Sequence, residues 1–410
     1  TIVGSSISKL GNEFTMKSIY QTNFNNQKVL VRVDFNVPLS PDKKVTDNSR
    51  IVAAKKTIDK IINDGGTAVL MSHLGRPKGN DPELSLSHIV KSVEDVLGKP
   101  VAFSKQTVGE ETQQIVENSK PGQIILLENL RYHNEEEAGD DSFAKELSKL
   151  GDSYVNDAFG TAHRAHASTS VIAKFFANKK FAGDLLLKEV DSIKKVIEDG
   201  QKPVLAILGG AKVSSKITII NNIIDKIDKL IIGGGMAFTF VKALGGKIGG
   251  SICENDKLDL ALSILEKAKQ NKVEVFLPVD VLCANDFSND ADTQICPINQ
   301  IPENWEGMDA GPKSLEIFKK AIESSKTILW NGPVGVFEME TFSKGTVAVG
   351  EFVSKSTSSG AFSLVGGGDS VAAVKQFNFS NKVSYVSTGG GAMLESLEGK
   401  TLPGIKALEQ

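Results

Sequence analysis

The sequence predicts an α/β protein built from two doubly wound parallel-sheet domains. Apolar, β-branched runs alternate over the whole chain with stretches whose apolar residues recur every three or four positions. Runs that are apolar throughout are typical of parallel strands buried on both faces by helices. The length of 410 residues exceeds what one hydrophobic core usually supports, which favours two Rossmann-like domains over one.

Strands are expected at similar spacing in both halves of the chain. The expected strands are 28–35, 67–72, 101–103, 123–127 and 153–157, and then 203–208, 229–233, 274–280, 327–330, 362–365 and 383–387. The segment from Arg50 to the Gly65-Gly66 stop predicts a helix. A glycine-free helical stretch, 184–199, is expected to join the domains, so the predicted domains are 1–185 and 186–393.

Composition indicates a soluble, cytoplasmic protein. The net charge of −3 gives no reason to expect nucleic acid or an acidic membrane as a partner. No apolar run reaches the roughly 18 residues of a membrane span, and no secretory signal is evident. Cys253, Cys283 and Cys296 form no CxxC pair, and an odd number suits a reducing compartment. Each cysteine is expected to be a small buried side chain.

Five strand ends in the second half run directly into glycine: AILGGAK, LIIGGGMAF, LWNGPVG, SLVGGGDS and VSTGGGAM. Ligands of parallel sheets bind beyond the carboxyl ends of the strands, where glycine lets backbone N–H groups approach phosphates. One such turn is often only a tight turn, but five on one sheet favour a phosphate-rich ligand. GxxxxGK[ST], GxGxxG and the protein-kinase motifs are absent, which disfavours P-loop, dinucleotide and protein-kinase sites.

Several side chains beside these turns could contact such a ligand. Lys212 and Lys216 are four apart, so we expect them on one helix face within reach of phosphates. Asp369 stands at a helix start, where it could cap the helix or bind Mg²⁺ together with phosphate oxygens. Asn331 and Glu338 could hydrogen-bond a ribose or base, although Glu338 could equally be a surface residue.

The first half concentrates the arginines. Only five of the 47 basic residues are arginine, and all five precede residue 165: Arg32, Arg50, Arg76, Arg131 and Arg164. Arginine offers a planar fork that binds phosphate or carboxylate through two hydrogen bonds. Arg32 lies within a predicted strand and is expected to be structural, paired with a carboxylate. Arg50 is expected in the first turn of a capped helix, where the dipole disfavours a cation and a bound anion would explain it.

These arginines, His73, His163 and His166 favour a pocket for a small polyanion, and Asp34 and Asn36, on one strand face, could bind its hydroxyl group. A metal site is disfavoured because His163 and His166 lack a third ligand at suitable spacing. No GxSxG elbow occurs, although a Ser-His-Asp arrangement stays open.

Many long motifs, in order, resemble the phosphoglycerate kinase family from about Lys17 to Leu408. They include VRVDFNVP, SHLGRP, LLENLRYHNEEE, NDAFGTAHRAHAS, LGGAKVSSKI, WNGPVGVFE, GGGDSVAA and STGGGAMLE. The resemblance implies reversible phosphoryl transfer from 1,3-bisphosphoglycerate to Mg-ADP, giving 3-phosphoglycerate and ATP. It also implies a cytoplasmic monomer of glycolysis with a hinge and a cleft between its domains, and a tail, 394–410, that returns to the N-terminal domain.

The resemblance further implies a role for each matching residue. The phosphoglycerate site would comprise Asp34, Asn36, Arg50, His73, Arg76, Arg131, His163, Arg164 and His166. The nucleotide site would comprise Gly210, Ala211, Lys212, Lys216, Gly234, Gly235, Gly307, Asn331, Pro333, Glu338, Gly368, Asp369 and Ser370, with Asp369 as the Mg²⁺ contact. Catalytic groups at the transferring phosphoryl would be Arg50, Lys212, Gly367 and Gly390.

The sequence departs from the family pattern in three places. Ser215 stands where the family often has Asp, which leaves Lys216 without a neighbouring carboxylate, and Ser370 replaces a frequent Thr but keeps its hydroxyl. Residues 1–16 extend beyond the usual start. A catalytically silent binding protein and an NAD-dependent dehydrogenase are the alternatives. A silent binding protein could have lost Arg50, Lys212 or Asp369, but all three are present. A dehydrogenase is disfavoured because the GxGxxG motif of dinucleotide sites is absent.

Overall fold

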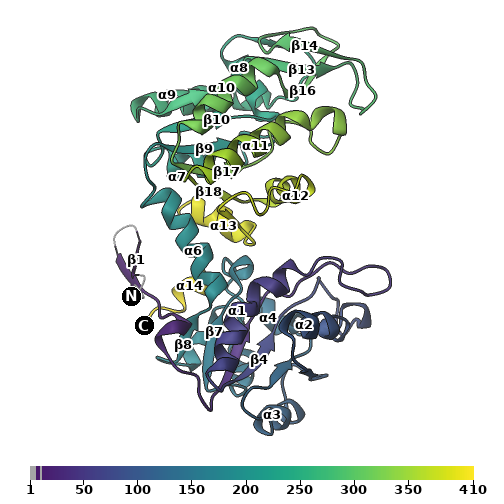
Figure 1. Cartoon of the computed structure of the whole chain (residues 1–410), viewed down its shortest axis with the longest axis vertical. Helices are drawn as coiled ribbons and strands as arrows, with labels where there is room; N and C mark the ends of the chain where they lie inside the picture. Colours follow the sequence, from purple (N-terminus) through teal and green to yellow (C-terminus); the bar gives the residue numbers. More distant parts are fainter. Residues whose placement is uncertain (1–5, 10–11) are drawn as a thin grey trace. The chain divides into compact units, whose positions relative to one another are not determined.

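The computed structural model describes residues 6–9 and 12–410 and divides into two compact units (Figure 1). The first unit comprises residues 1–190 with Thr401–Gln410, and the second comprises Asp191–Lys400. The first division falls inside α6 (Asp184–Ile197), the helix expected between the domains. The second lies at 400 and not at 393, because α13 (Gly391–Leu397) packs on α7 (Ile217–Ile223).

A six-stranded parallel sheet with the order β5-β6-β4-β3-β7-β8 forms the centre of the first unit. Its strands are β3 Lys28–Arg32, β4 Thr67–Met71, β5 Val101–Phe103, β6 Ile124–Leu126, β7 Ser153–Asn156 and β8 Lys180–Ala182. Its helices are α1 Ser49–Asn63, α2 Val90–Leu97, α3 Glu110–Glu117, α4 Asn134–Ala138, α5 Asp141–Ser148 and α14 Pro403–Lys406. The short β8 was not predicted, because it begins with a lysine, follows two further polar residues and so shows no apolar run.

The core of this unit follows from the sequence periodicity. Ile51, Ile58 and Ile61 recur on one face of α1 and are fully buried. They pack in one cluster with strand residues such as Val31 and Leu70. Burial of each such side chain contributes about 1.5–3 kcal/mol, so the helix is held mainly by its packing.

The second unit has a six-stranded parallel sheet with the order β12-β10-β9-β17-β18-β19. Its strands are β9 Val204–Leu208, β10 Lys229–Ile232, β12 Glu274–Phe276, β17 Thr327–Asn331, β18 Phe362–Val365 and β19 Tyr385–Val386. Besides α7 and α13, its helices are α8 Met236–Ala243, α9 Leu258–Gln270, α10 Pro312–Glu323, α11 Lys344–Ser358 and α12 Gly368–Gln376.

An antiparallel sheet with the order β14-β13-β16 was missed from the sequence. Its strands are β13 Asp280–Ala284, β14 Thr293–Pro297 and β16 Glu306–Ala310. The predicted strand 274–280 starts correctly but is too long, since β12 ends before Pro278 and β13 begins at Asp280. Four of the five β14 residues are exposed and β16 reads EGMDA, so neither shows a buried-strand pattern.

The chain ends return to the first unit. Gly404 N–H donates to the Ala162 carbonyl at 2.8 Å, and Met16 pairs with Glu409. Within the extension, β1 (Ser6–Lys9) and β2 (Asn12–Thr15) pair antiparallel, while 1–5 and 10–11 lie outside the described residues. Two smaller strands, β11 (Lys247–Ile248) and β15 (Gln300–Ile301), pair in the second unit.

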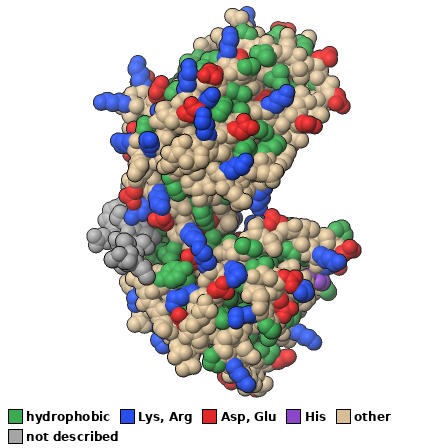
Figure 2. Space-filling view, in the orientation of Figure 1, with side chains coloured by type: hydrophobic (Ala, Val, Ile, Leu, Met, Phe, Trp, Pro, Cys, Tyr) green, Lys and Arg blue, Asp and Glu red, His purple; other side chains and the backbone are tan. Residues whose placement is uncertain are grey.

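The surface carries both signs of charge. Figure 2 shows basic and acidic side chains interspersed on the visible face of each unit. Over the residues described, no helix combines the length and the apolar composition that crossing a membrane requires. Cys283 and Cys296 are buried as expected, Cys253 is only partly buried, and all three are free thiols.

Candidate active site

The glycine-rich turns of the second unit lie at the carboxyl end of its parallel sheet and pack backbone against backbone. Gly210 N–H donates to the Pro333 carbonyl at 3.2 Å. A Cβ at Gly209 would lie 2.1 Å from the Pro333 oxygen, and one at Gly234 would lie 2.7 Å from the Gly210 nitrogen. The glycines at 209 and 234 are therefore required for the turns to meet, in addition to any ligand they approach.

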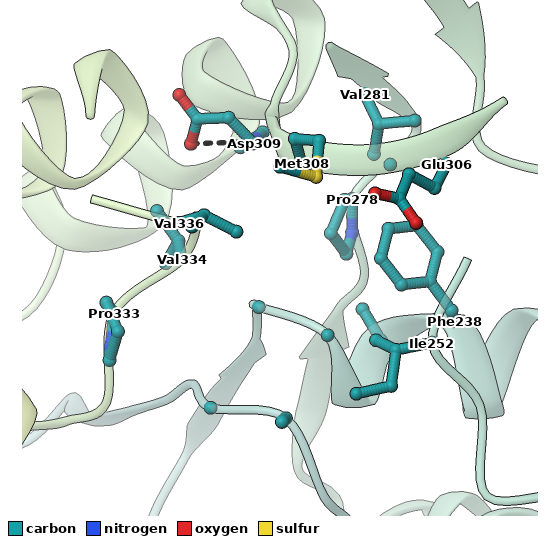
Figure 3. A pocket seen from close by; sticks show the side chains of 18 of the residues that line it. Phe238, Ile252, Pro278, Val281, Glu306, Met308, Asp309, Pro333, Val334 and Val336 are labelled. Atoms are coloured by element: carbon teal, nitrogen blue, oxygen red, sulfur yellow. Dashed lines mark hydrogen bonds between the residues drawn. The ribbon is translucent and has the colours of Figure 1, made fainter. Parts of the chain in front are cut away.

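A cavity of about 500 Å³ opens beside these turns (Figure 3). Its lining includes eight residues implied by the family resemblance: Gly210, Ala211, Gly234, Gly235, Gly307, Pro333, Glu338 and Asp369. Phe238, Ile252 and Val334 add apolar walls that the sequence did not single out, because such side chains read as core. A volume of this size suits a nucleotide-sized ligand.

The remaining residues predicted for the nucleotide are not part of this lining, and two of them hold the turns in place. Asn331 is buried, accepts from the Lys216 ammonium and donates to the Gly366 carbonyl at 2.8 Å. Ser370 Oγ accepts from the Gly332 N–H at 2.6 Å. The amide of Asn331 is thus engaged within the protein, which differs from the expected ribose or base contact.

The two lysines do not share a helix face. Because α7 begins only at Ile217, Lys212 and Lys216 stand at the ends of a non-helical turn. Lys212 is exposed, whereas burial lowers the pKa of Lys216 against an opposing effect of Asp369. Ser215 Oγ donates to the Lys212 carbonyl at 2.7 Å. The serine that departs from the family pattern therefore forms a hydrogen bond within this turn.

The carboxylate of Asp369 is open to a ligand. Asp369 is the second residue of α12 and is exposed at the cavity. The helix has no side-chain cap, and the described residues provide no hydrogen bond or ion pair to this carboxylate. The alternative that Asp369 merely caps the helix is therefore not supported, and its charge is available to a cation beside bound phosphates.

Asp309 is a buried carboxyl group that the sequence did not single out. It accepts from the backbone N–H groups of Ala310 at 2.9 Å and Gly345 at 2.8 Å, and thereby ties β16 to α11. Burial raises its pKa to about 7. The group positions the cavity wall formed by β16.

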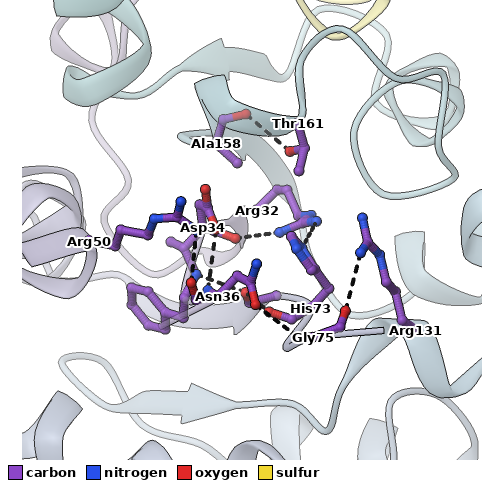
Figure 4. A network of polar contacts seen from close by, with 12 residues as sticks. Arg32, Asp34, Asn36, Arg50, His73, Gly75, Arg131, Ala158 and Thr161 are labelled. Atoms are coloured by element: carbon purple, nitrogen blue, oxygen red, sulfur yellow. Dashed lines mark hydrogen bonds and ion pairs between the residues drawn. The ribbon is translucent and has the colours of Figure 1, made fainter. Parts of the chain in front are cut away.

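In the first unit, strand ends bring the predicted polar residues together (Figure 4). Arg50 Nη1 donates to the Asn36 carbonyl at 2.8 Å and to Asp34 Oδ1 at 3.3 Å. Asn36 Oδ1 accepts from the Gly75 N–H at 2.8 Å, and Arg131 Nη1 donates to the Gly75 carbonyl at 3.2 Å. Residues that follow β3, β4 and β6 therefore form one connected cluster with the start of α1.

Asn48, which directly precedes α1, makes no capping hydrogen bond, but Asp47 Oδ1 accepts from the Ser49 N–H at 2.9 Å, so a side chain does satisfy the first N–H of the helix. Arg50 nevertheless stands in its first turn, where the helix dipole opposes a cation. The carboxylate of Asp34 offsets this cost. Only Nη1 of Arg50 has hydrogen-bond partners among the described residues, so the rest of the guanidinium can meet a ligand.

Arg32 is fully buried but does not form the predicted ion pair with a carboxylate in the described part of the chain. Its Nε donates to Ser168 Oγ at 2.8 Å, and this hydroxyl donates in turn to the Glu136 carboxylate. Its Nη2 lies 3.0 Å from His73 Nδ1. Because a guanidinium can only donate, His73 Nδ1 accepts and the ring carries its proton on Nε2.

Burial and neighbouring arginines together lower the pKa values of two histidines in this cluster. Burial and then Arg32, Arg131 and Arg50 hold the pKa of His73 well below its usual value. Burial and then Arg131 and Arg32 lower the pKa of His166 to about 4. Cations gathered with few compensating carboxylates are typical of an anion site.

Arg76 and Arg164 are exposed members of the same cluster. Their charges act on Arg131 and His166 respectively, which places them within electrostatic range of it. His166 is buried and its Nδ1 has no hydrogen-bond partner among the described residues, while His163 is only half-buried. Within the described ranges, no three His, Cys, Asp or Glu side chains gather as a metal site would require.

Comparison with known proteins agrees with this arrangement. The sequence model of the family "Phosphoglycerate kinase" matches residues 19–400. A phosphoglycerate kinase of Porphyromonas gingivalis is 51% identical over 416 aligned residues, which cover 96% of this chain and 100% of the relative. "Phosphoglycerate kinase 3, cytosolic" of Arabidopsis thaliana is 47% identical, covering 96% and 98%.

Solved structures extend the likeness to three dimensions. The structure of phosphoglycerate kinase from Coxiella burnetii superimposes with a TM-score of 0.88 at 42% identity, covering 96% of this chain and 98% of that chain. Full-length similarity in sequence and fold, on a chain with a basic cluster in one unit and a glycine-lined cavity in the other, shows that this chain belongs to the phosphoglycerate kinase family.

Proposed function

We propose that the chain carries out the phosphoglycerate kinase reaction with phosphoglycerate bound by the first unit and Mg-nucleotide by the second. The observation that carries this division is the separate chemistry of the two sheet ends. One gathers arginines and uncharged histidines, and the other surrounds a cavity with glycine turns. The first suits a small polyanion and the second a nucleotide.

In the first unit, the arginines would hold the phosphate that is not transferred. Arg131 is held by its hydrogen bond to Gly75, and Arg76 and Arg164 are exposed. Their guanidinium groups, which follow different strands, could therefore bind one phosphate together. Asp34 and Asn36 stand beside Arg50 and would bind the hydroxyl group of the substrate. His73 and His166 would act as uncharged hydrogen-bonding neighbours, and His163 would be a further hydrogen-bonding neighbour.

In the second unit, the nucleotide phosphates would face the turns at Gly210 and Gly234, and the base would enter the apolar part of the cavity. Glu338 is exposed at the lining, where it could accept from ribose hydroxyl groups. Lys216 would contact phosphate from a position that Asn331 fixes.

Asp369 would hold Mg²⁺, because its carboxylate is unengaged and magnesium prefers one or two carboxylates together with phosphate oxygens. When bound, the ion neutralises charge on the phosphates. Among the described residues, no group of three His, Cys, Asp or Glu side chains could hold the ion, so phosphate oxygens and water would complete its ligands.

The chemistry needs charge stabilisation and no general base. An acyl phosphate has a carboxylate as its leaving group, and the attacking oxygen of ADP is already ionised. The transferring group must instead be stabilised by positioned cations and backbone N–H groups. We assign these roles to Arg50 from the first unit, to Lys212 from the second, and to the backbone at Gly367 and Gly390, which precede α12 and α13.

The test is a coupled assay of ATP formation from 1,3-bisphosphoglycerate and ADP with the full chain. We expect turnover that requires Mg²⁺ and that runs in reverse with 3-phosphoglycerate and ATP. Binding of both ligands without turnover would instead identify a silent binding protein. We further propose a monomer in the cytosol, in keeping with a relative that is named cytosolic. Sedimentation at micromolar concentration tests the oligomeric state.

A further inference from the structure

Glu306 is an acidic side chain in an otherwise apolar part of the cavity. It is the first residue of β16, and its carboxylate points toward the cavity between Pro278 and the ring of Phe238 (Figure 3). The next residue, Gly307, lies so close to this ring that a Cβ there would be 2.2 Å from a ring carbon. Strand and ring therefore form one continuous wall, and the carboxylate is the polar group in it.

This carboxylate has no partner among the residues that the structure describes. Its Oε1 is shielded from solvent, and neither a hydrogen bond nor an ion pair to it exists among the described residues. Burial and the charge of Asp286 raise its pKa. An unpaired buried acceptor is costly, so a native protein that keeps one commonly uses it for a ligand.

The position of Glu306 in the cavity places it near the base of a bound nucleotide. The same cavity is lined by Gly210, Gly234 and Asp369, which belong to the phosphate-facing turns. In Figure 3, Pro333, which follows β17, lies on the opposite side of the cavity from Glu306. A nucleotide whose phosphates face the turns then has its base beside Glu306.

We propose that Glu306 determines base specificity by accepting a hydrogen bond from the 6-amino group of adenine. The inference rests on the proposed function of this cavity as the nucleotide site. Adenine presents an N–H donor at this position, which matches an acceptor without a partner. Guanine and hypoxanthine present a carbonyl oxygen there, and two acceptors facing each other repel.

The test compares ADP with purine riboside 5′-diphosphate, which lacks only the 6-amino group, in the ATP-forming direction. The wild-type chain is expected to favour ADP in kcat/KM by about tenfold or more, since a hydrogen bond to a charged acceptor is lost. Glu306→Met should bring the two substrates within about twofold of each other. Glu306→Gln, which keeps an acceptor oxygen, should retain part of the preference. Because each ratio is measured on one enzyme preparation, it does not depend on how much of a variant folds.

Glu303→Met is the matched control, because Glu303 is exposed and lies three residues earlier in the same segment. It should keep the wild-type ratio. The proposal is overturned if the wild-type chain uses both substrates equally, if Glu306→Met leaves its ratio unchanged, or if GDP is preferred to ADP. In each of these cases the chain is still an active kinase. Absence of turnover with every nucleotide would instead contradict the proposed function.

Discussion

At the residue scale, the polar cluster of the first unit is built from side chains that follow several different strands, and hydrogen bonds link them to one another. Arg50, Arg131, His73 and Asn36 were predicted because they follow strands that end at one sheet edge, and the structure brings them together. The hydrogen bonds of Arg32 and Asn331 could not be predicted, because they depend on Ser168 and Gly366, which are distant in sequence. Glu306 was missed since a single carboxylate in a polar segment gives no pattern.

We expect the free energy of unfolding to depend on pH because of the lowered pKa of His166. Its pKa falls from the usual 6.5 to about 4 in the folded chain, so between these values the unfolded chain binds a proton that the folded chain does not. Folding stability is therefore lost as pH falls from 6.5 toward 4. His166→Gln cannot titrate, so its free energy of unfolding should improve relative to wild type by about 1–2 kcal/mol between pH 7 and pH 5. Urea unfolding at both pH values measures this, and a difference that does not change with pH contradicts it.

We expect the Mg²⁺ concentration that the reaction requires to depend on Asp369. Asp369→Asn removes the charge that would hold Mg²⁺, so the Mg²⁺ concentration for half-maximal ATP formation should rise roughly tenfold or more. Glu338→Gln is the control, because it neutralises another exposed carboxylate of the same cavity and should not shift this concentration. Equal Mg²⁺ requirements in wild type and Asp369→Asn would exclude the assignment.

At the scale of elements, the parallel strands were predictable and the antiparallel ones were not. β9, β10 and β17 are buried on both faces, so each reads as an apolar run. β14 and β16 lie at the side of the unit and show no such run, although β16 supplies one wall of the cavity. The helix α6 was predicted from its periodicity, but how its first turn is anchored depends on contacts over long sequence distances.

The first turn of α6 is held by Asp157, and Gly183 leaves the space that this carboxyl group occupies. Asp157 Oδ1 accepts from the N–H groups of Leu185 at 3.0 Å and Leu186 at 3.4 Å, and burial raises the pKa of Asp157 to about 8. A Cβ at Gly183 would lie 2.1 Å from that oxygen. Gly183→Ala should therefore displace the carboxyl group and lower the free energy of unfolding by roughly 2–4 kcal/mol.

The control for this prediction is Gly250→Ala. The nearest atom to a Cβ at Gly250 is the Glu303 oxygen at 3.4 Å, so we expect a change within about 0.5 kcal/mol. Denaturant unfolding followed by circular dichroism measures both variants. Equal losses in the two would show that the contact with Asp157 does not support the helix.

At the scale of the whole molecule, two parallel sheets were predicted because the pattern of strands and helices occurs twice in sequence. The unit boundaries were less predictable, since one lies inside α6 and the other depends on the packing of α13 against α7. Our account assigns the acceptor of the phosphoryl group and its donor to different units.

The most direct test of this account is the turnover of Arg50→Ala together with its affinity for ADP. We predict that kcat for ATP formation falls about a hundredfold or more, because a cation on the transferring group is lost. The Kd for Mg-ADP, measured by titration calorimetry, should stay within about twofold of wild type, because Arg50 lies in the first unit and the proposed nucleotide site lies in the second. Lys55→Ala removes a half-buried cation of the same helix that pairs with Asp59; it is the control and should keep wild-type kcat. Near-normal turnover of Arg50→Ala would contradict the account.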